Sequence, residues 1–387
     1  MSKWEWKKLK DICEKGSSNI KQSDLKDLTG DYPIFGASGY IQNVDFYQRD
    51  RDYIGIIKDG SGVGRTMLLP AFSSVIGTLQ YILPKEENDI KFINYALQNI
   101  DFSKSVQGAA IPHIYFKDYG ETEILVPPLS EQNRIVKFLD EEFSKIDTLK
   151  TNAETNLKNA KELFETTLEK ELNPLSHHSE RSEESSAELP SGWEWKSLQE
   201  ISNVYGEYGL SVPSTSYNGI RYLRITDITD DGRLNDEYVS ADIEKIEESD
   251  KLQEGDILFA RTGATVGKTL IFKEDYGCCV FAGYLIRYRP KKEVVLPFYL
   301  HYVTHSKSYF DWVKKSQKAA AQPNISAKLY NTFQIPLPPL SVQKEIVARL
   351  DKLSENVKRL EANYKQIIAD CDELKKSILK KTFERES

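Results

Sequence analysis

The sequence predicts an α/β (α+β) protein built from two copies of one mixed-sheet domain, each followed by a long α-helix. Three observations support this prediction. Phrases from the first half of the chain recur in the same order in the second half. Aromatic and β-branched runs alternate with Gly, Asn and Asp turns. After each such region, a Pro-Pro-Leu-Ser phrase opens an apolar pattern of helical period. A chain of 387 residues can bury two substantial cores.

The duplication can be followed along the chain. Its anchors include WEWKKLKDI at 4–12 and WEWKSLQEI at 193–201, IPHI at 111–114 and QPNI at 322–325, and VPPLSEQNRIVKFLD at 126–140 and LPPLSVQKEIVARLD at 337–351. The offset between the copies grows from 189 to 211, so the second copy carries insertions. We expect globular domains at 1–128 and 191–339, long helices at 129–172 and 340–387, and a polar, serine-rich, flexible linker at 173–190.

The globular parts contain short segments with distinct local signals. The runs YIGIIKD, SVIGTLQYILP, GDILFAR and CCVFAGYLIRYRP are rich in β-branched and aromatic residues and predict strands. The runs FINYALQNI and FYLHYVTHS have apolar residues at helical spacing and predict short helices between the strands. A mixed sheet with short helices is therefore expected in each copy.

The long helices carry apolar residues at alternating steps of four and three, which predicts a coiled-coil seam. The first helix has a wider apolar face than the second, and the simplest partner for each helix is its duplicate. Ser130 and Ser341 are placed to cap the helix N-termini. The residues predicted to form the seam or to dock partner chains are Leu139, Ile146, Leu149, Leu350, Leu353, Val357, Leu360, Ile367 and Leu374.

The stretch ARTGATVGKT at 260–269 ends in the letters of a phosphate-binding loop. That motif needs a glycine five positions before the second glycine, and this position holds Thr262. The same phrase occurs earlier as DGSGVGRT, with Arg65 in place of Lys268. A glycine turn inside a duplicated domain explains both copies better than a nucleotide site does.

Composition excludes several functional classes. The four cysteines lack metal or disulfide spacing, the five histidines show no metal pattern, and no signal peptide or membrane-length apolar run is present. These features favour a reducing cytoplasm, with no membrane association. The net charge of −7 argues against a protein that holds DNA by charge alone. We expect any DNA reader of this composition to rely on partners for affinity.

Two globular domains, each opening with W-E-W-K and each followed by P-P-L-S-x-Q and a long helix, resemble the specificity subunit of type I restriction-modification systems. The resemblance covers nearly the whole chain. Its most specific pieces are YPIFGASGY at 32–40, GDILFARTGATVGK at 255–268, and the paired PPLSEQNRIV and PPLSVQKEIV.

The resemblance implies a division of labour between subunits. Each globular part would be a target-recognition domain for one half of an asymmetric, split site in double-stranded DNA. The long helices would pack as an antiparallel coiled coil, on which two methyltransferase subunits dock, and a restriction and translocation subunit would join for cleavage. S-adenosylmethionine would be held by the methyltransferase, with no cofactor in this chain. The Pro-Pro pairs also lack the Asn or Asp and the aromatic residue of an amino-methyltransferase motif, so we expect no catalytic residues here.

Base edges are read by Arg, Lys, Asn or Gln side chains on loops and strand ends. Candidates in the first domain are Lys58, Ser61, Arg65, Gln80, Lys104, Gln107 and His113. Candidates in the second domain are Arg221, Arg224, Arg261, Thr262, Lys268, Lys315, Gln317, Lys318 and Asn324.

Other functions fit the sequence less well. The chain could serve a restriction enzyme of another type, or be a silent copy kept for recombination. A scaffold or adhesion protein would explain the duplication but not the shared phrases, and a solo methyltransferase lacks its motifs. A P-loop nucleotide-binding protein is the least favoured alternative, because the loop spacing fails.

Overall fold

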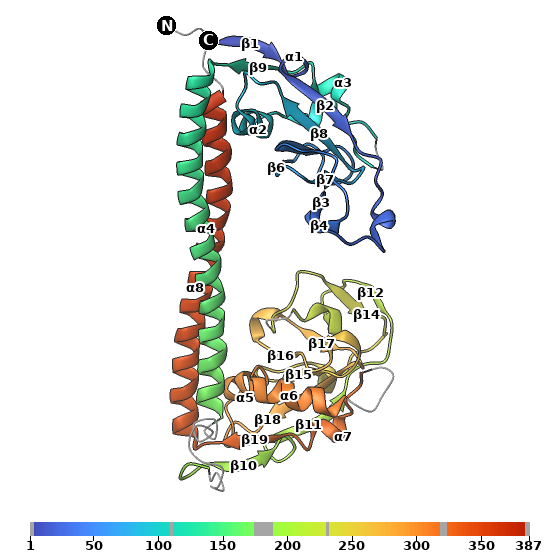
Figure 1. Ribbon diagram of the computed structural model, residues 1–387. Helices are drawn as coiled ribbons and strands as arrows, with labels where there is room; N and C mark the ends of the chain where they lie inside the picture. The colour runs from blue at the N-terminus through green and yellow to red at the C-terminus, as the bar shows by residue number, and fades with distance from the viewer. Residues whose placement is uncertain (1–3, 109–110, 174–188, 230–231, 318–322, 384–387) are drawn as a thin grey trace. The chain divides into compact units, whose positions relative to one another are not determined.

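The computed structural model describes residues 4–108, 111–173, 189–229, 232–317 and 323–383. Residues 174–188 of the predicted linker are not among these residues. They include the adjacent histidines His177 and His178. The chain divides into two compact units. The first unit comprises residues 1–155 with 364–387, and the second comprises residues 156–363. Each unit therefore contains one globular copy and parts of both long helices (Figure 1).

The helices and strands of the first globular copy follow the predicted runs. They are β1 (Glu5–Lys8), α1 (Leu9–Ile12), β2 (Cys13–Ser17), β3 (Tyr32–Gly36), β4 (Gly39–Val44), β5 (Tyr53–Ile57), β6 (Thr66–Leu69), β7 (Ser74–Val75), β8 (Leu79–Pro84), α2 (Ile90–Gln98), α3 (Phe116–Tyr119) and β9 (Glu123–Val126), and then α4 (Leu129–Leu172).

The second copy repeats this order with additional short strands. Its elements are β10 (Glu194–Ser197), β11 (Ser202–Tyr208), β12 (Ser214–Ser216), β13 (Arg221–Leu223), β14 (Val239–Ala241), β15 (Ile257–Ala260), β16 (Thr269–Ile271), β17 (Cys279–Phe281), β18 (Leu285–Pro290), α5 (Pro297–Val303), α6 (Lys307–Ser316), α7 (Ala327–Tyr330) and β19 (Gln334–Leu337), and then α8 (Leu340–Phe383).

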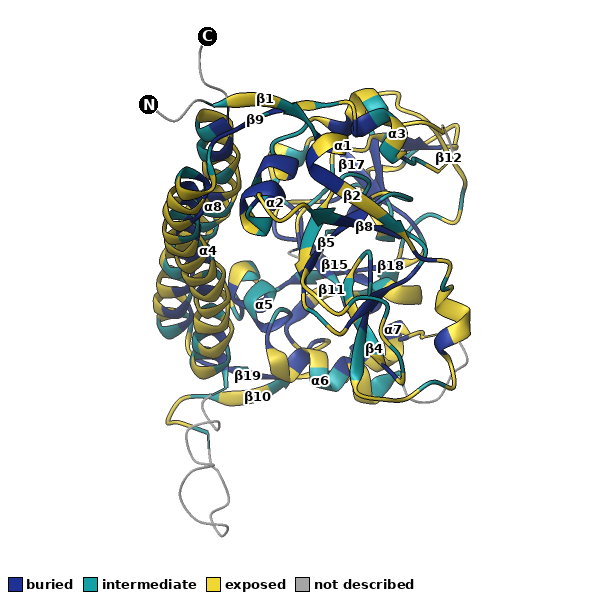
Figure 2. Cartoon of the chain, turned by 45° about the horizontal axis from the view of Figure 1, so that its top comes forward, coloured by how far each residue is buried: buried dark blue, intermediate teal, exposed yellow. Residues whose placement is uncertain are grey.

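The two copies share the topology of their main sheet. Each has a four-stranded antiparallel sheet, ordered β2-β8-β5-β6 in the first copy and β11-β18-β15-β16 in the second. Each also has one parallel strand pair, β3 with β7 and β13 with β17, as the mixed-sheet prediction requires. The opening W-E-W-K strand pairs antiparallel with the strand that leads into the long helix, β1 with β9 and β10 with β19. The central strands are buried, as the dark blue of β5 and β15 in Figure 2 shows.

The long helices pack antiparallel within each unit. In the first unit, Ile135, Leu139 and Phe143 of α4 share a core with Cys371 and Leu379 near the end of α8. In the second unit, the end of α4 shares a core with the start of α8 through Leu168, Leu172, Ile346 and Leu350. Ion pairs join the helices in both units: Lys150 with Asp372 (2.7 Å), Lys375 with Asp147 (2.5 Å), and Arg349 with Glu171 (2.6 Å).

The heptad seam is wrong at three predicted positions. Leu149, Leu360 and Leu374 are 51%, 38% and 49% exposed, whereas Leu139, Ile146, Leu350 and Val357 are buried as expected. Leu353 and Ile367 are half-buried. A straight helix drifts by about 20° per heptad from a strict 3.5-residue repeat, so a stripe read from sequence rotates out of the contact.

The capping prediction is also wrong. Each helix begins one residue before the serine, so Ser130 and Ser341 lie exposed in the first turn. The residue that anchors each helix is the glutamine two positions later. Gln132 and Gln343 are 1% and 0% exposed.

These glutamines make equivalent hydrogen bonds in the two copies. The Gln132 Oε1 atom accepts from the Asp89 N–H (2.8 Å), and its Nε2 atom donates to the Pro127 carbonyl (2.9 Å). The Gln343 Oε1 atom accepts from the Leu296 N–H (2.8 Å), and its Nε2 atom donates to the carbonyls of Pro338 (2.8 Å) and Val294 (3.0 Å). Each glutamine therefore ties the Pro-Pro loop and the long helix to the N-terminus of α2 or α5.

A second pair of hydrogen bonds recurs between the copies. The Tyr95 hydroxyl on α2 donates to Asp140 on α4, and the Tyr302 hydroxyl on α5 donates to Asp351 on α8, both at 2.6 Å. Burial raises the pKa of both tyrosines, so both hydroxyls keep the proton that they donate. The short helix of each copy is thus fixed to its long helix at two levels.

We predict that Gln343→Leu lowers the free energy of unfolding by about 3 kcal/mol or more, because buried partners left without a hydrogen bond each cost about 1–3 kcal/mol. Urea unfolding measures the loss, and hydrogen exchange should show reduced protection at residues 294–303. The exposed Gln366 on the same helix provides the control, and Gln366→Leu should change stability by less than about 0.5 kcal/mol. Unchanged stability and protection in Gln343→Leu would contradict the anchoring role.

We also predict unequal effects of two seam substitutions on α8. Leu350→Asp places an unpaired charge in a fully buried position and should cost about 3–5 kcal/mol. Leu360→Asp changes a position that is partly solvated and should cost less than about 1 kcal/mol. Thermal and urea unfolding of the two variants test this difference. Equal losses of unfolding free energy would show that Leu360 is part of the buried seam after all.

Candidate nucleic-acid interface

The glycine phrase forms the same hairpin–loop frame in both copies. We define this frame as residues 57–65 with 112–114 in the first copy, and residues 260–268 with 323–325 in the second. In the second copy it is held by hydrogen bonds from Gly267 N–H to Ala260 O (3.0 Å), Ala260 N–H to Lys268 O (2.9 Å), Gly263 N–H to Pro323 O (3.1 Å) and Ile325 N–H to Arg261 O (2.9 Å).

The first copy repeats each of these bonds at the matching position. They run from Gly64 N–H to Ile57 O (2.9 Å), Ile57 N–H to Arg65 O (2.9 Å), Gly60 N–H to Pro112 O (2.9 Å) and Ile114 N–H to Lys58 O (2.9 Å). The x-Pro-x-Ile loop therefore crosses the base of the glycine hairpin in both copies. This contact joins segments about 50 to 60 residues apart and was not visible in the sequence.

The geometry of the turn explains its glycines and excludes a phosphate-binding loop. Gly267 has φ +88°, and a Cβ atom there would lie 2.8 Å from a Val313 methyl group. Gly64 has φ +86° and lies equally close to the Phe102 ring. A P-loop continues into a helix whose N-terminus binds the phosphate, whereas this turn continues into strand β16.

The second frame presents one arginine toward solvent with its side chain held in place. The Arg261 guanidinium lies 4.8 Å from the Tyr208 ring centroid. Its Nε atom donates to Asn324 Oδ1 (3.5 Å), and Nη1 donates to the Gly283 carbonyl (3.4 Å). Arg261 is half-buried and Asn324 is exposed. Thr262, half-buried, forms a backbone bridge with Asn324, so these predicted residues are brought together.

The first frame carries different side chains at the matching positions. Lys58 forms an ion pair with Asp59 at 3.5 Å. His113 pairs through its backbone with Asp59 and Gln107, and its ring packs edge-on against Tyr115. The Gln107 side chain donates to Asp118 (3.1 Å). Lys58, Gln107 and His113 therefore lie together, as the second set does.

The structure contradicts three of the predicted base contacts. Gln80 is buried and accepts a hydrogen bond from the Tyr119 hydroxyl (2.7 Å). Arg221 is 3% exposed, donates to the carbonyls of Asn235 (2.6 Å) and Glu237 (2.8 Å), and lies over the Tyr238 ring. These two side chains cannot reach a base edge, because their polar atoms point into the domain.

Arg224 is the third contradicted residue. Its guanidinium bonds both oxygens of the buried Asp227 (3.1 and 2.7 Å) and also pairs with Glu237 (2.9 Å). The hydrogen bond to Asp227 raises the pKa of Arg224. A base contact would have to replace these carboxylates, so Arg224 serves the fold of its loop.

The other predicted residues occupy varied positions around the domains. Ser61, Arg65, Lys104 and Lys315 are exposed, whereas Lys268 and Gln317 are half-buried. Lys268 has an interaction partner inside the structure. Lys318 lies outside the described residues.

Sequence reasoning missed the exposed aromatic residues. Tyr284 and Phe281 lie in the run CCVFAGYLIRYRP that predicts strands, but Tyr284 is 60% exposed while Phe281 is buried. Tyr208 is also exposed and packs against Arg261. The glycine before Tyr284 was the available signal, because it places this tyrosine in the turn between β17 and β18.

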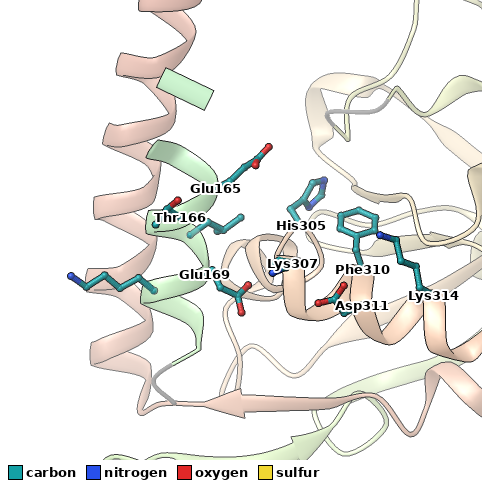
Figure 3. Close-up of a pocket in the computed structure, with 10 residues that line it drawn as sticks. Glu165, Thr166, Glu169, His305, Lys307, Phe310, Asp311 and Lys314 are labelled. Atoms are coloured by element: carbon teal, nitrogen blue, oxygen red, sulfur yellow. The ribbon is translucent and has the colours of Figure 1, made fainter. Parts of the chain in front are cut away.

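A hollow also lies elsewhere in the second unit. It has a volume of about 730 Å³ and lies between α4 and α6 (Figure 3). Its lining mixes the carboxylates Glu165, Glu169 and Asp311 with Lys307 and Lys314. Glu169 accepts hydrogen bonds from the Ser308 backbone N–H (3.2 Å) and hydroxyl, so it joins α4 to the start of α6.

The described residues offer little support for a metal site, a reactive cysteine or a membrane-spanning helix. Within them, no group of three or more His, Cys, Asp or Glu side chains could hold a metal ion. Burial raises the pKa of Cys13 to about 12 and that of Cys279 to about 11, so neither thiol is an activated nucleophile. None of the helices described is long and apolar enough to cross a membrane.

Comparisons with solved structures agree with this fold. The chain aligns with a protein from a structure of type I R-M system assembly at a TM-score of 0.73 and 21% identity, covering 98% of this chain and 97% of that one. It aligns with the HsdS subunit from Thermoanaerobacter tengcongensis at a TM-score of 0.57 and 21% identity, covering 98% and 96%.

Sequence comparisons identify relatives of the same kind. The type I restriction enzyme EcoBI specificity subunit of Escherichia coli is 26% identical over 297 residues, which are 73% of this chain and 62% of that protein. The MjaVIII specificity subunit of Methanocaldococcus jannaschii is 24% identical over 380 residues, which are 92% of this chain and 88% of that protein. The family described as type I restriction modification DNA specificity domain matches residues 1–159 and 190–369. Since these two matches span most of the chain, the protein belongs to the type I restriction-modification DNA specificity family.

Proposed function

We propose that this chain is the DNA-recognition subunit of a type I restriction-modification complex, and that each globular copy reads one half of a split, asymmetric site in double-stranded DNA. The observation that carries the proposal is the repeated hairpin–loop frame. The two copies share the backbone hydrogen bonds of this frame but differ in the side chains that it presents. Equal frames with unequal reading surfaces favour two different half-sites.

Charge supports a reader that depends on partners. The net charge is −7, and many of the basic side chains pair with carboxylates inside the same copy, as Arg224, Arg287 and Arg289 do. Affinity for DNA grows with the number of phosphates that Lys and Arg neutralise. We therefore expect weak, salt-sensitive binding by the chain alone and tight binding only within the complex.

The exposed leucines of the long helices support docking of partner subunits. In the first unit, Leu149 of α4 and Leu374 of α8 lie at one level of the helix pair, beside the ion pair of Lys150 with Asp372. In the second unit, Leu163 and Leu360 are also exposed. On this proposal two methyltransferase subunits dock on the helices, and a restriction and translocation subunit joins them. The methyltransferases would bind S-adenosylmethionine and perform the chemistry, so this chain would act without catalytic residues.

The location follows from the same proposal. The protein would act in the cytoplasm, where its DNA is and where its four free cysteines would stay reduced. No observation favours a nucleotide-binding function. A specificity chain for another restriction enzyme type, or a silent copy, would share this fold, so the experiment below must separate these possibilities.

We predict that replacing residues 191–339 with the corresponding domain of another family member changes one half of the methylated sequence only. The chain is co-expressed with the methyltransferase subunit of its own system, and methylated bases are mapped across the genome. The unaltered chain should give one split motif, with a constant gap that is free in sequence. A matched replacement of residues 1–128 should change the other half-site.

A continuous motif, or a change in both halves after one replacement, would contradict the two-reader proposal. Complete absence of methylation with the unaltered chain, combined with sequence-specific binding of the chain to DNA, would point to an enzyme of another type. Absence of both would point to a silent copy.

A further inference from the structure

We infer that Arg261 and Asn324 form a base-reading pair that recognises a guanine in one half-site, and that Lys58 and His113 occupy the equivalent position in the first copy. This inference rests on the proposed function and deepens it. It narrows the predicted contact residues to one position of one backbone frame, and it names the base that the second copy reads there.

The repeated frame provides an internal comparison between the copies. Arg261 and Lys58 each accept a hydrogen bond on the backbone carbonyl from the isoleucine of the crossing loop, both at 2.9 Å. Asn324 and His113 each precede that isoleucine. The frame is held by backbone hydrogen bonds, so the side chains at these four positions can change without breaking the frame. Side chains that vary on a constant frame are suited to reading different sequences.

Arg261 differs from the other arginines of the second copy. This copy contains six arginines. Arg221 is buried against carbonyl groups, and Arg224, Arg287 and Arg289 pair with carboxylates. Arg233 also has a partner inside the structure. Among the described residues, no carboxylate lies within 4.0 Å of the Arg261 guanidinium, which instead contacts the Tyr208 ring, the Asn324 amide oxygen and the Gly283 carbonyl.

The contacts of Arg261 orient its planar guanidinium for a two-point contact. The Tyr208 ring supports one face, and the Tyr208 hydroxyl is itself fixed by the Ala327 N–H (3.0 Å). Asn324 and Gly283 engage Nε and Nη1 at the long distances of 3.5 and 3.4 Å, which leaves Nη2 and part of the capacity of Nη1 for a ligand. A guanidinium held in this way loses less conformational entropy on binding than a mobile arginine does.

The chemistry of this donor set selects guanine among the bases. In the major groove, guanine presents two adjacent acceptors, O6 and N7, which match the two parallel donors of an arginine. Adenine replaces one of these acceptors with an amino donor, so it would oppose one guanidinium N–H. In the first copy, Lys58 presents a cation from the same backbone position, and the neighbouring carboxylate of Asp59 lies 3.5 Å away. A lysine with an acidic neighbour makes a less directional contact, so the two copies should differ in their selectivity.

The test maps methylated sites for the whole complex carrying Arg261→Gln, Arg261→Lys or the control Lys328→Gln. Lys328 is exposed on α7, four residues after Asn324, and its substitution removes the same charge from the same domain. We expect a guanine in the unaltered second half-site. Its preference over other bases should fall by roughly 5- to 150-fold in Arg261→Gln, and also in Arg261→Lys, which keeps the charge but loses the paired donors. The first half-site and the Lys328→Gln motif should stay unchanged.

Three results would overturn the inference. The first is a second half-site without guanine, and the second is an unchanged preference for guanine in Arg261→Gln. The third is uniform loss of methylation at all sites in both Arg261 variants with an unchanged thermal midpoint. This third result would assign Arg261 to phosphate binding. If the substitution unfolds the domain, Lys58→Gln in the first copy tests the same position and should alter only the first half-site. If the unaltered complex still gives a split motif, any of these results contradicts only the role of Arg261 and leaves the proposed function standing. Failure of the inference is therefore distinguishable from failure of the proposed function.

Discussion

The structure depends on one buried glutamine at the start of each long helix. Gln132 and Gln343 use both ends of the side-chain amide to join the Pro-Pro loop to the N-terminus of α2 or α5. A buried amide is stable only when its donors and acceptors are satisfied, so the loop and the two helices must meet in one arrangement. The P-P-L-S-x-Q phrase therefore specifies how a globular copy sits on its own helix. The tyrosine–aspartate pair, whose aspartate lies about two turns further along the long helix, reinforces that arrangement.

The hairpin–loop frame, which we propose presents the reading surface, is held mainly by its own backbone. Glycines with positive φ close the hairpin, and one of them in each copy allows a side chain from the following segment to pack directly on the turn. The crossing loop then satisfies the backbone groups at the base of the hairpin. Since backbone atoms hold the frame, its side chains can differ between the copies without loss of the fold. On the proposed function, this separation of support from recognition lets one duplicated unit serve two reading surfaces.

Most arginines of the second copy pair with groups inside the domain, so few remain available to contact a ligand. Arg287 and Arg289 both pair with the fully buried Asp256, and Arg221 fills a site lined by carbonyl oxygens. Buried carboxylates and carbonyls need donors, because an unpaired polar group in the core costs free energy. Many basic side chains of the domain therefore pair with carboxylates and carbonyls inside it. Near Arg261, the exposed Tyr208 ring lies under the guanidinium, and the carbonyl of the exposed Tyr284 accepts a hydrogen bond from the Arg261 N–H (3.1 Å).

The sequence by itself determined the duplication, the strand-rich domains, the short helices between the strands and the two long helices, because all of these follow from repeated phrases and local periodicity. It also disfavoured a phosphate-binding loop, through the spacing of its glycines and its recurrence in both copies. Only the tertiary structure decided which polar residues face solvent. Arg221 and Arg261 both lie at strand ends and have the same chemistry, yet carbonyls brought from 14 and 16 residues away bury the first, whereas a distant tyrosine and asparagine display the second. The same reason applies to Leu149, Leu360 and Leu374, because the face that a helix buries is set by the packing of its partner and not by its own repeat.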